Sequence, residues 1–168
     1  VERFGGLDTM VHNALAPTGP PHEIEDVPVE TWRSMMDTAV RASFNCAQAA
    51  FAQLRERQGS LILLTSAAGV EGSPYIPAYG LVKAAQRGLA KSLAREWGPL
   101  GIRVNCISPG GYFSNQPAPF VNAYCERTPL GRMAGEEDIK GVSVFLASDA
   151  SAYITGANVP LEGGWTAV

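Results

Sequence analysis

The sequence predicts an α/β fold in which helices cover both faces of a parallel sheet. Short, densely apolar segments alternate along the chain with longer segments whose apolar residues recur at helical spacing. Glycine, proline and polar residues separate the two kinds of segment, as loops between strands and helices require. This order is typical of successive βαβ units with right-handed crossovers.

Four apolar segments are predicted to be strands. The first covers residues 7–12, and the second, 60–65, is apolar enough to be buried on both faces. The third covers residues 101–107 and is expected to be broken by the turn-forming residues 108–111. The last predicted strand lies near residues 158–161.

Three helices are predicted from the spacing of apolar residues, over residues 29–57, 78–97 and 136–147. The first two are long and amphipathic. The predicted loops cover residues 13–27, 67–77 and 114–134, the last with a short helix and a mobile flap over a crevice.

Composition excludes several classes of protein. With 168 residues, 46% of them hydrophobic, the chain is long enough for one sizeable core, so residues 1–168 are expected to form a single domain. A net charge of -3 without any run of Lys or Arg argues against nucleic acid or an anionic membrane as partner. No apolar run approaches the ~18 residues of a membrane span, and the first residues show no signal-peptide pattern.

Cysteine and histidine are too sparse for a disulfide framework or a metal site. The three cysteines, Cys46, Cys106 and Cys125, are odd in number and widely spaced, which is typical of reduced residues in a cytoplasmic protein. The two histidines, His12 and His22, are isolated, so structural or solvent-exposed roles are expected for them.

Ser66, Tyr79 and Lys83 carry the groups that alcohol oxidation or ketone reduction needs. A free tyrosine loses its proton only near pH ~10, so it is a poor base at neutral pH unless its anion is stabilised. Lys83 follows Tyr79 by four residues, on the same face of the predicted helix, where its ammonium favours the phenolate. Tyr79 is therefore predicted to be a general acid or base.

Ser66 follows the second predicted strand, at the edge where parallel sheets place their ligand crevice. From there its hydroxyl would donate to a developing oxyanion. Taken alone, however, a tyrosine followed four residues later by a lysine is a weak motif that a solvated helix face also explains. Motifs elsewhere in the chain decide between these interpretations.

Four ordered motifs run through the whole chain. They are Val11-His12-Asn13-Ala14, the segment from Ser66 to Lys83 with its separation of thirteen residues between Ser66 and Tyr79, the segment from Arg103 to Gly110, and the closing segments 153–156 and 162–165. Together they resemble the carboxyl-terminal two thirds of the short-chain dehydrogenase/reductase family. The resemblance implies a Rossmann-like doubly wound parallel sheet, truncated at its amino-terminal side, with residues 1–168 as the catalytic portion of a partial domain.

The resemblance also implies the roles of individual residues. Ser66 would orient the substrate oxygen, Tyr79 would exchange the proton, and Lys83 would also reach the nicotinamide ribose of NAD or NADP. The residues implied in cofactor binding are, besides Tyr79 and Lys83, Asn13 and Ala14 after the first strand and Pro109, Gly110, Tyr112 and Ser114 after the third. For Asn13, a side chain that stabilises its own turn is an equally good interpretation.

Three features depart from the family's pattern. No glycine-rich turn that would bind a pyrophosphate follows a strand and opens a helix. Ala39 stands where the family has a catalytic asparagine, which predicts slower or rerouted proton exchange. His12 and Leu15 replace the usual asparagine and glycine of the first motif, so a narrowed cofactor pocket is expected.

The missing glycine-rich turn also bears on the sheet. In the family, the strand that resembles residues 7–12 lies mid-sheet, and two βαβ units imply on the order of 80 further residues before it. An open central strand is a pairing hazard. The chain is therefore expected to be part of a longer polypeptide or to pair this edge with another chain.

The predicted function is NAD(P)-dependent oxidation of a secondary alcohol or reduction of a ketone. The expected partner is a small-molecule carbonyl or alcohol compound, and the two long helices predict a homodimer or homotetramer, as they do in the family. One alternative is a cofactor-free lyase that resembles the halohydrin dehalogenases, although these have arginine where this chain has Lys83. Another is a non-catalytic remnant or scaffold. Substrate identity, NAD or NADP preference and reaction direction stay open.

Overall fold

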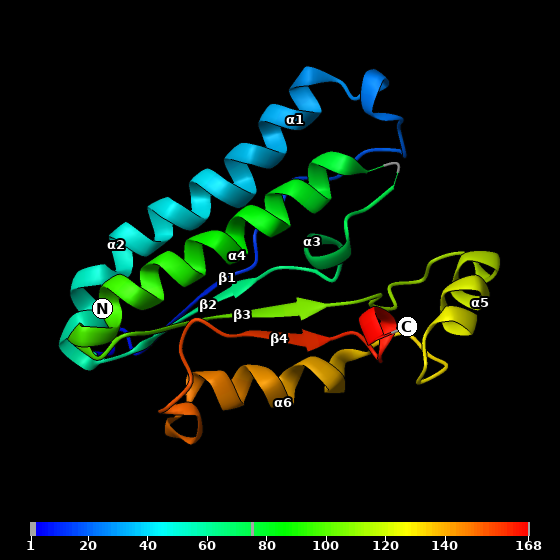
Figure 1. Cartoon of the computed structure of the whole chain (residues 1–168). Helices are drawn as coiled ribbons and strands as arrows, with labels where there is room; N and C mark the ends of the chain where they lie inside the picture. The colour runs from blue at the N-terminus through cyan, green and yellow to red at the C-terminus, as the bar shows by residue number, and fades with distance from the viewer. Residues whose placement is uncertain (1–2, 75, 168) are drawn as a thin grey trace.

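The computed structural model describes residues 3–74 and 76–167, in which four parallel strands form a sheet with helices on both faces (Figure 1). The strands lie side by side in chain order, and each neighbouring pair is parallel. Their bounds are β1 Thr9–His12, β2 Ser60–Leu64, β3 Arg103–Pro109 and β4 Asn158–Leu161. The predicted α/β class and parallel pairing are confirmed.

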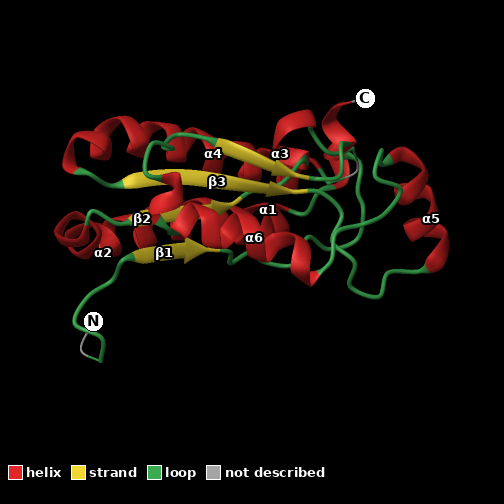
Figure 2. Ribbon diagram, turned by 90° about the horizontal axis from the view of Figure 1, so that it is seen from below, coloured by secondary structure: helices red, strands yellow, loops and turns green. Residues whose placement is uncertain are grey.

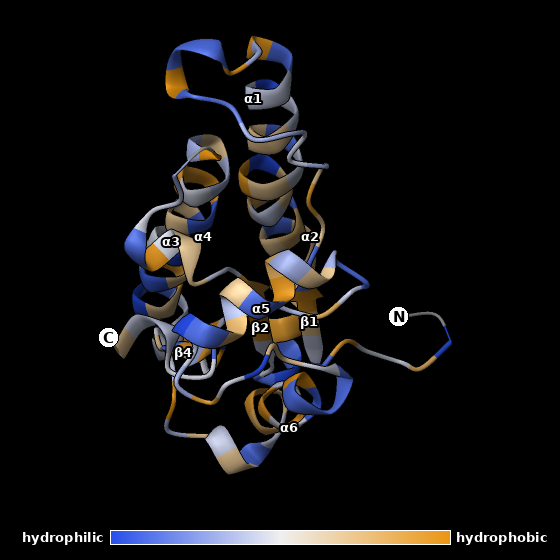
Figure 3. Ribbon diagram, turned by 90° about the vertical axis from the view of Figure 1, so that its right-hand side faces the viewer, coloured by the Kyte–Doolittle hydropathy of each residue, from blue (hydrophilic) through white to orange (hydrophobic). Residues whose placement is uncertain are grey.

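Two long helical rods cover one face of the sheet. Helix α4 is one of them, and it lies beside a rod formed by α1, a π-helical segment and α2 (Figures 1 and 3). Helix α6 covers the opposite face, and α5 lies beyond the carboxyl ends of the strands (Figure 1). The bounds are α1 Val29–Met35, the π-helical segment Met36–Arg41, α2 Ala42–Arg57, α4 Pro77–Trp97, α5 Ala118–Arg127 and α6 Glu136–Ala147.

Strand β2 forms the centre of the hydrophobic core, because helices cover both of its faces. Successive side chains of a strand point to opposite faces. Leu61 and Leu63 accordingly pack toward α2 and α4, against Leu54 and Trp97. Ile62 and Leu64 pack in a second cluster with Leu146 of α6. The apolar density of this segment predicted burial on both faces, and all five residues of β2 are buried.

Several element bounds differ from those predicted. Strand β1 begins at Thr9 rather than at residue 7. Strand β3 continues to Pro109 instead of breaking at Ser108, because β4 pairs with it there and the Pro109 carbonyl accepts a hydrogen bond from Ala67 N–H. The predicted loop over residues 67–77 contains a short helix, α3, Ala68–Glu71.

The edge of the sheet at β1 has no strand beside it among the described residues. The amino-terminal segment leaves from this edge, as Figure 2 shows from the side of α6. Val11, in the middle of β1, is 49% exposed, in contrast to the buried residues of β2. The sheet therefore ends on an open strand, as the resemblance predicted.

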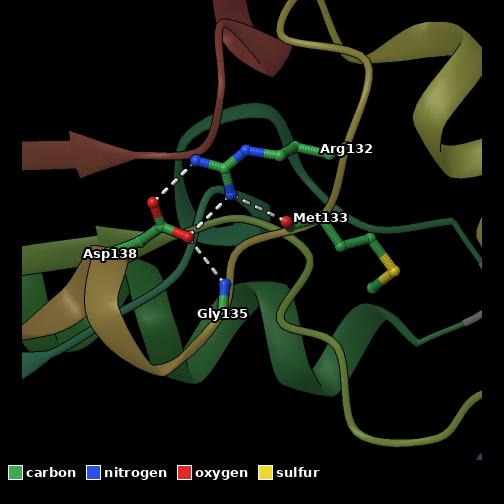
Figure 4. A network of polar contacts seen from close by, with 4 residues as sticks. All are labelled: Arg132, Met133, Gly135 and Asp138. Atoms are coloured by element: carbon green, nitrogen blue, oxygen red, sulfur yellow. Dashed lines mark hydrogen bonds and ion pairs between the residues drawn. The ribbon is translucent and has the colours of Figure 1, made fainter.

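A polar cluster fixes the start of α6 (Figure 4). Arg132 donates two hydrogen bonds to the Asp138 carboxylate, at 2.7 and 2.8 Å, and Asp138 Oδ2 also accepts from Gly135 N–H at 2.7 Å. These bonds hold the pKa of Asp138 well below its ordinary value, with the Arg132 hydrogen bond as the main cause. The segment that precedes α6 is thereby tied to the first turn of the helix.

Over the ranges 3–74 and 76–167, no helix is both long and apolar enough to cross a membrane. The same residues contain no group of three or more His, Cys, Asp or Glu side chains placed to hold a metal ion.

Candidate active site

Ser66 lies just beyond the carboxyl end of β2, as predicted. Thr65 N–H and Ala67 N–H donate to the carbonyls of Ile107 and Pro109, at 2.8 and 2.9 Å, so the chain on both sides of Ser66 is held against β3. Ser66 Oγ accepts a hydrogen bond from Ala68 N–H at 3.2 Å. The side chain is mostly buried, which fixes the hydroxyl at the sheet edge.

Tyr79 and Lys83 lie one turn apart on α4 and face the end of β2. Lys83 is only 4% exposed, and its ammonium donates to the Leu64 carbonyl at 2.7 Å. Lys83 Nζ lies 5.9 Å from the centre of the Tyr79 ring. Burial lowers the pKa of Lys83 to about 8, against a smaller opposing effect of Cys106. A solvated helix face, the simpler interpretation of this pair, does not fit a lysine buried to this degree.

Two pockets that are lined by predicted site residues besides Tyr79 meet at this tyrosine. The first has a volume of about 450 Å³ and is lined by Lys83 and, among the other residues predicted to bind cofactor, by Asn13, Pro109, Gly110 and Tyr112. The second, of about 570 Å³, is lined by Ser66. Tyr79 and Gly110 line both pockets. Tyr79 thus lines a pocket with Lys83 and a second pocket with Ser66.

Two predicted cofactor residues do not line the first pocket. Ala14, which follows β1, is exposed. Ser114 is also exposed, and its backbone N–H donates to Gln116 Oε1 at 2.7 Å. Leu15 does line this pocket, at the position where the resemblance implies a glycine. Contacts of Ala14 and Ser114 with a cofactor stay a prediction.

The aromatic wall of the second pocket was not predicted from the sequence. Tyr124 of α5 stacks on Trp165, with ring centres 4.2 Å apart and planes 10° apart. The guanidinium carbon of Arg127 lies over the Trp165 ring, 4.3 Å from its centre. Trp165 Nε1 also donates to Glu71 at 3.2 Å. Local patterns do not reveal such a wall, because its members come from segments far apart in the chain.

The glycines at the site serve close packing. A Cβ on Gly111 would lie 2.5 Å from the ring of Tyr124, and one on Gly110 would lie 2.8 Å from the Tyr124 hydroxyl. A Cβ on Gly69 would lie 2.8 Å from the backbone of Lys83. These three glycines let backbone segments and the Tyr124 ring approach one another more closely than a side chain would allow.

Comparison with known proteins identifies the family. A family model described as enoyl-(acyl carrier protein) reductase matches residues 1–166. The chain is 37% identical over 167 residues to trans-4-hydroxycyclohexanecarboxylate dehydrogenase of Sinomonas cyclohexanicum. It is 36% identical over 169 residues to 3-oxoacyl-[acyl-carrier-protein] reductase of Staphylococcus aureus. The chain belongs to the short-chain dehydrogenase/reductase family. The family predicted from the four motifs is thus confirmed.

The chain matches only part of each short-chain dehydrogenase/reductase relative. Nearly all of it, 98–99%, aligns with 63% of the Sinomonas protein and 68% of the Staphylococcus protein. Solved structures agree with this coverage. The gluconate 5-dehydrogenase of Burkholderia cenocepacia, in complex with NADP and tartrate, aligns with a TM-score of 0.93 at 29% identity over 99% of this chain and 68% of that one. A Leptospira borgpetersenii short chain dehydrogenase with bound NAD⁺ aligns with a TM-score of 0.89 at 32% identity, over 98% and 67%.

Proposed function

We propose that this chain is the catalytic portion of an NAD(P)-dependent oxidoreductase that interconverts a ketone and a secondary alcohol, with Tyr79 as the general acid or base. The observation that carries this proposal is the position of Tyr79 between two pockets, with Lys83 lining one and Ser66 the other. A reaction between a bound cofactor and a bound substrate needs such a junction, where a proton-transferring group touches both sites.

The first pocket fits the nicotinamide end of a dinucleotide. Lys83 donates one ammonium proton to the Leu64 carbonyl, so two remain, and at least one of them can bind a ribose hydroxyl. Asn13, Pro109 and Gly110 line the same pocket. A bound nicotinamide ring supplies the acceptor or donor of the hydride. Relatives with bound NADP and NAD⁺ support a cofactor of this class.

The residues of this chain then perform the proton chemistry. The Ser66 hydroxyl lines the second pocket, where it orients the substrate oxygen and donates to it as negative charge develops. Tyr79 gives a proton to that oxygen during reduction and takes it back during oxidation. The Lys83 ammonium favours the phenolate that is left after Tyr79 gives up its proton.

The second pocket supports a small carbonyl or alcohol compound as substrate. Phe120, Tyr124 and Trp165 form its apolar wall, while Arg127 and Glu71 add charged groups. Dispersion against such a wall favours a substrate with a ring or a short apolar chain beside the reacting oxygen. Two relatives are named for a hydroxycyclohexanecarboxylate, which has a ring, and for a 3-oxoacyl group on acyl carrier protein, which has an acyl chain.

A matched pair of tyrosine variants tests the proposal. The protein as its gene encodes it is assayed for ketone-dependent oxidation of NADH and NADPH with cyclic ketones and 3-oxoacyl thioesters. Tyr79→Phe is expected to lower kcat by about 10²- to 10⁴-fold, because it removes the proton-transferring hydroxyl. The control is Tyr153→Phe, since Tyr153 is fully exposed and touches neither pocket.

Cofactor binding is measured separately by the fluorescence of NAD(P)H. Tyr79→Phe should bind within a few-fold of the parent protein, and Lys83→Ala should lose binding. Equal turnover in Tyr79→Phe would contradict the role of Tyr79. Failure to bind NAD(P)H would favour a non-catalytic scaffold, and cofactor-independent halide release from a halohydrin would favour the lyase.

A further inference from the structure

A buried polar cluster lies beside the first pocket and contains a histidine that the proposed chemistry does not use. His12 at the end of β1, Ser43 of α2 and Gln86 of α4 are each at most 3% exposed. Ser43 Oγ lies 3.1 Å from His12 Nδ1, 2.9 Å from Gln86 Nε2 and 2.5 Å from the carbonyl oxygen of Ala39. Ala39 lies in the π-helical segment, and its carbonyl also accepts from Gln86 at 3.3 Å.

The hydrogen bonds of Ser43 determine which nitrogen of His12 carries the proton. A serine hydroxyl has one proton to donate, and the carbonyl of Ala39 can only accept it. Ser43 Oγ must therefore accept from Gln86 Nε2 and from His12 Nδ1. Gln86 Nε2 also lies 3.4 Å from His12 Nδ1, but its two protons have shorter contacts, with Ser43 Oγ at 2.9 Å and with the Ala39 carbonyl at 3.3 Å. His12 thus carries its proton on Nδ1, which leaves Nε2 as a hydrogen-bond acceptor.

Two buried acceptors of this cluster have no partner among the described residues. They are His12 Nε2 and Gln86 Oε1. Leaving a buried acceptor unpaired costs about 1–3 kcal/mol, so such groups usually bind an ordered water. A water has two protons to donate, which matches the two acceptors, and it can accept one hydrogen bond in return.

Lys83 lies beside this cluster and can donate to such a water. In the sheet, His12 pairs with Leu63, and the next carbonyl along β2, that of Leu64, holds the Lys83 ammonium at 2.7 Å. Gln86 follows Lys83 by three residues on the same buried side of α4. Burial lowers the pKa of His12, and the positive charge of Lys83 adds a smaller effect in the same direction, which favours the neutral imidazole.

We propose that His12 Nε2 and Gln86 Oε1 hold one water that accepts a hydrogen bond from the Lys83 ammonium, which makes His12 the positioning residue for Lys83. The catalytic meaning of this contact rests on the proposed function, but the contact itself does not. It places a polar contact for Lys83 beside the π-helical segment, where Ala39 offers only a methyl group.

The tautomer of His12 tests the first step. Long-range ¹H–¹⁵N NMR spectra are recorded on the ¹⁵N-histidine-labelled protein as its gene encodes it, with His12→Gln and His22→Asn used to assign the two rings of this chain. His12 should be neutral at pH 7, with the proton on Nδ1. A proton on Nε2, or a charged ring, would overturn the proposal. His22 is the internal control, since it belongs to no such cluster.

The titration of Lys83 tests the second step. Its pKa is followed by ¹³Cε NMR in the parent protein, in His12→Gln, which keeps an acceptor, and in His12→Leu, which removes it. Because an acceptor favours the charged ammonium, His12→Leu should lower the midpoint by about 0.5 or more from about 8, and His12→Gln should change it less. Cys106 of β3 also faces Lys83, but burial raises the pKa of its thiol to about 12, above the range of the titration.

An unchanged Lys83 midpoint in His12→Leu would contradict the proposal. If His12→Leu does not fold, His12→Gln and the tautomer measurement still decide. In an active enzyme, the alkaline limb of kcat/KM should move with the Lys83 midpoint, which a purely structural role of His12 does not predict. An inactive protein that nevertheless shows the Nδ1–H tautomer and the shifted Lys83 would refute only the proposed function.

Discussion

Lys83 combines two properties that rarely occur together in a lysine. Its side chain is almost fully buried, and its ammonium has a single hydrogen-bonding partner in the described protein, the carbonyl of Leu64. Burial disfavours the charged form and lowers the pKa of Lys83 to about 8. The residue is therefore poised to lose its charge just above neutral pH.

The stability of the protein should depend on pH through Lys83. Its pKa falls from 10.5 in the unfolded chain to about 8 in the folded one, so the unfolded state binds more protons between these values. The free energy of unfolding should consequently rise from about pH 8 to pH 10.5, and Lys83→Met should lack this rise. Urea denaturation over this pH range measures both proteins.

The matched control for Lys83 is Lys91→Met, because Lys91 is an exposed lysine on the same helix. It should retain the pH dependence of the parent protein. Parallel curves for the parent and Lys83→Met would show that Lys83 is not the group that causes the rise.

At the level of elements, the short helix α3 holds the loop of Ser66 against α4. Gly69 of α3 lies against the backbone of Lys83 and Ala84. A Cβ added to Gly69 would lie only 2.8–2.9 Å from these backbone atoms. Arg87 donates to the carbonyl of Gly69 at 2.8 Å across the same contact. The close packing of α3 on α4 thus depends on a residue without a side chain.

Gly69→Ala should damage both stability and catalysis. The added methyl group meets backbone atoms, which cannot rotate away, so α3 and α4 must move apart. Overpacking of this kind costs about 1–3 kcal/mol, and a displacement of about 1 Å at a catalytic site can cost 10²-fold in rate. Thermal denaturation and kcat/KM are the measurements.

Gly88→Ala is the matched control on α4. No atom lies within 4 Å of a Cβ at this position, so the substitution should stabilise the helix by up to about 1 kcal/mol and leave kcat/KM unchanged. If the two variants lose similar activity, close packing at Gly69 is not what positions the site.

For the whole molecule, apolar surface remains open at two places. One is the edge strand β1, and the other is the outer side of the two helical rods, where Phe44 of α2 and Leu81 of α4 are 49% and 45% exposed. Figure 1 shows the rods side by side, with no described element covering their outer side. Exposed apolar residues on neighbouring helices are typical of a surface that binds another copy of the chain.

We expect a dimer or tetramer at micromolar concentration in sedimentation velocity experiments on the protein as its gene encodes it. The double variant Phe44→Glu with Leu81→Glu should shift the distribution to smaller species, because it places charges on the apolar surface. The control is Leu130→Glu, which introduces the same charge at a 68% exposed leucine after α5. A monomeric parent protein, or equal association of the double variant, would rule out this interface.

Much of the fold and part of the site could be predicted from local patterns. The apolar density of residues 60–64 predicted a strand buried on both faces, and the spacing of Tyr79 and Lys83 predicted a shared helix face. Such patterns are informative because the apolar density of a buried strand and the spacing of a helix face can both be read from a short window of the sequence. The four ordered motifs identified the family for the same reason, since each is a short contiguous segment.

Other features depend on contacts between segments that are distant in the chain. Three such features are the junction of two pockets at Tyr79, the stack of Tyr124 on Trp165, and the cluster of His12 with Ser43 and Gln86. Sequence alone predicted a structural or solvent-exposed role for His12 and, together with Leu15, a narrowed cofactor pocket. The contacts of His12 with Ser43 and Gln86 form only where β1, α2 and α4 pack together. A buried hydrogen bond depends on which distant atoms reach it, and only the tertiary structure determines that.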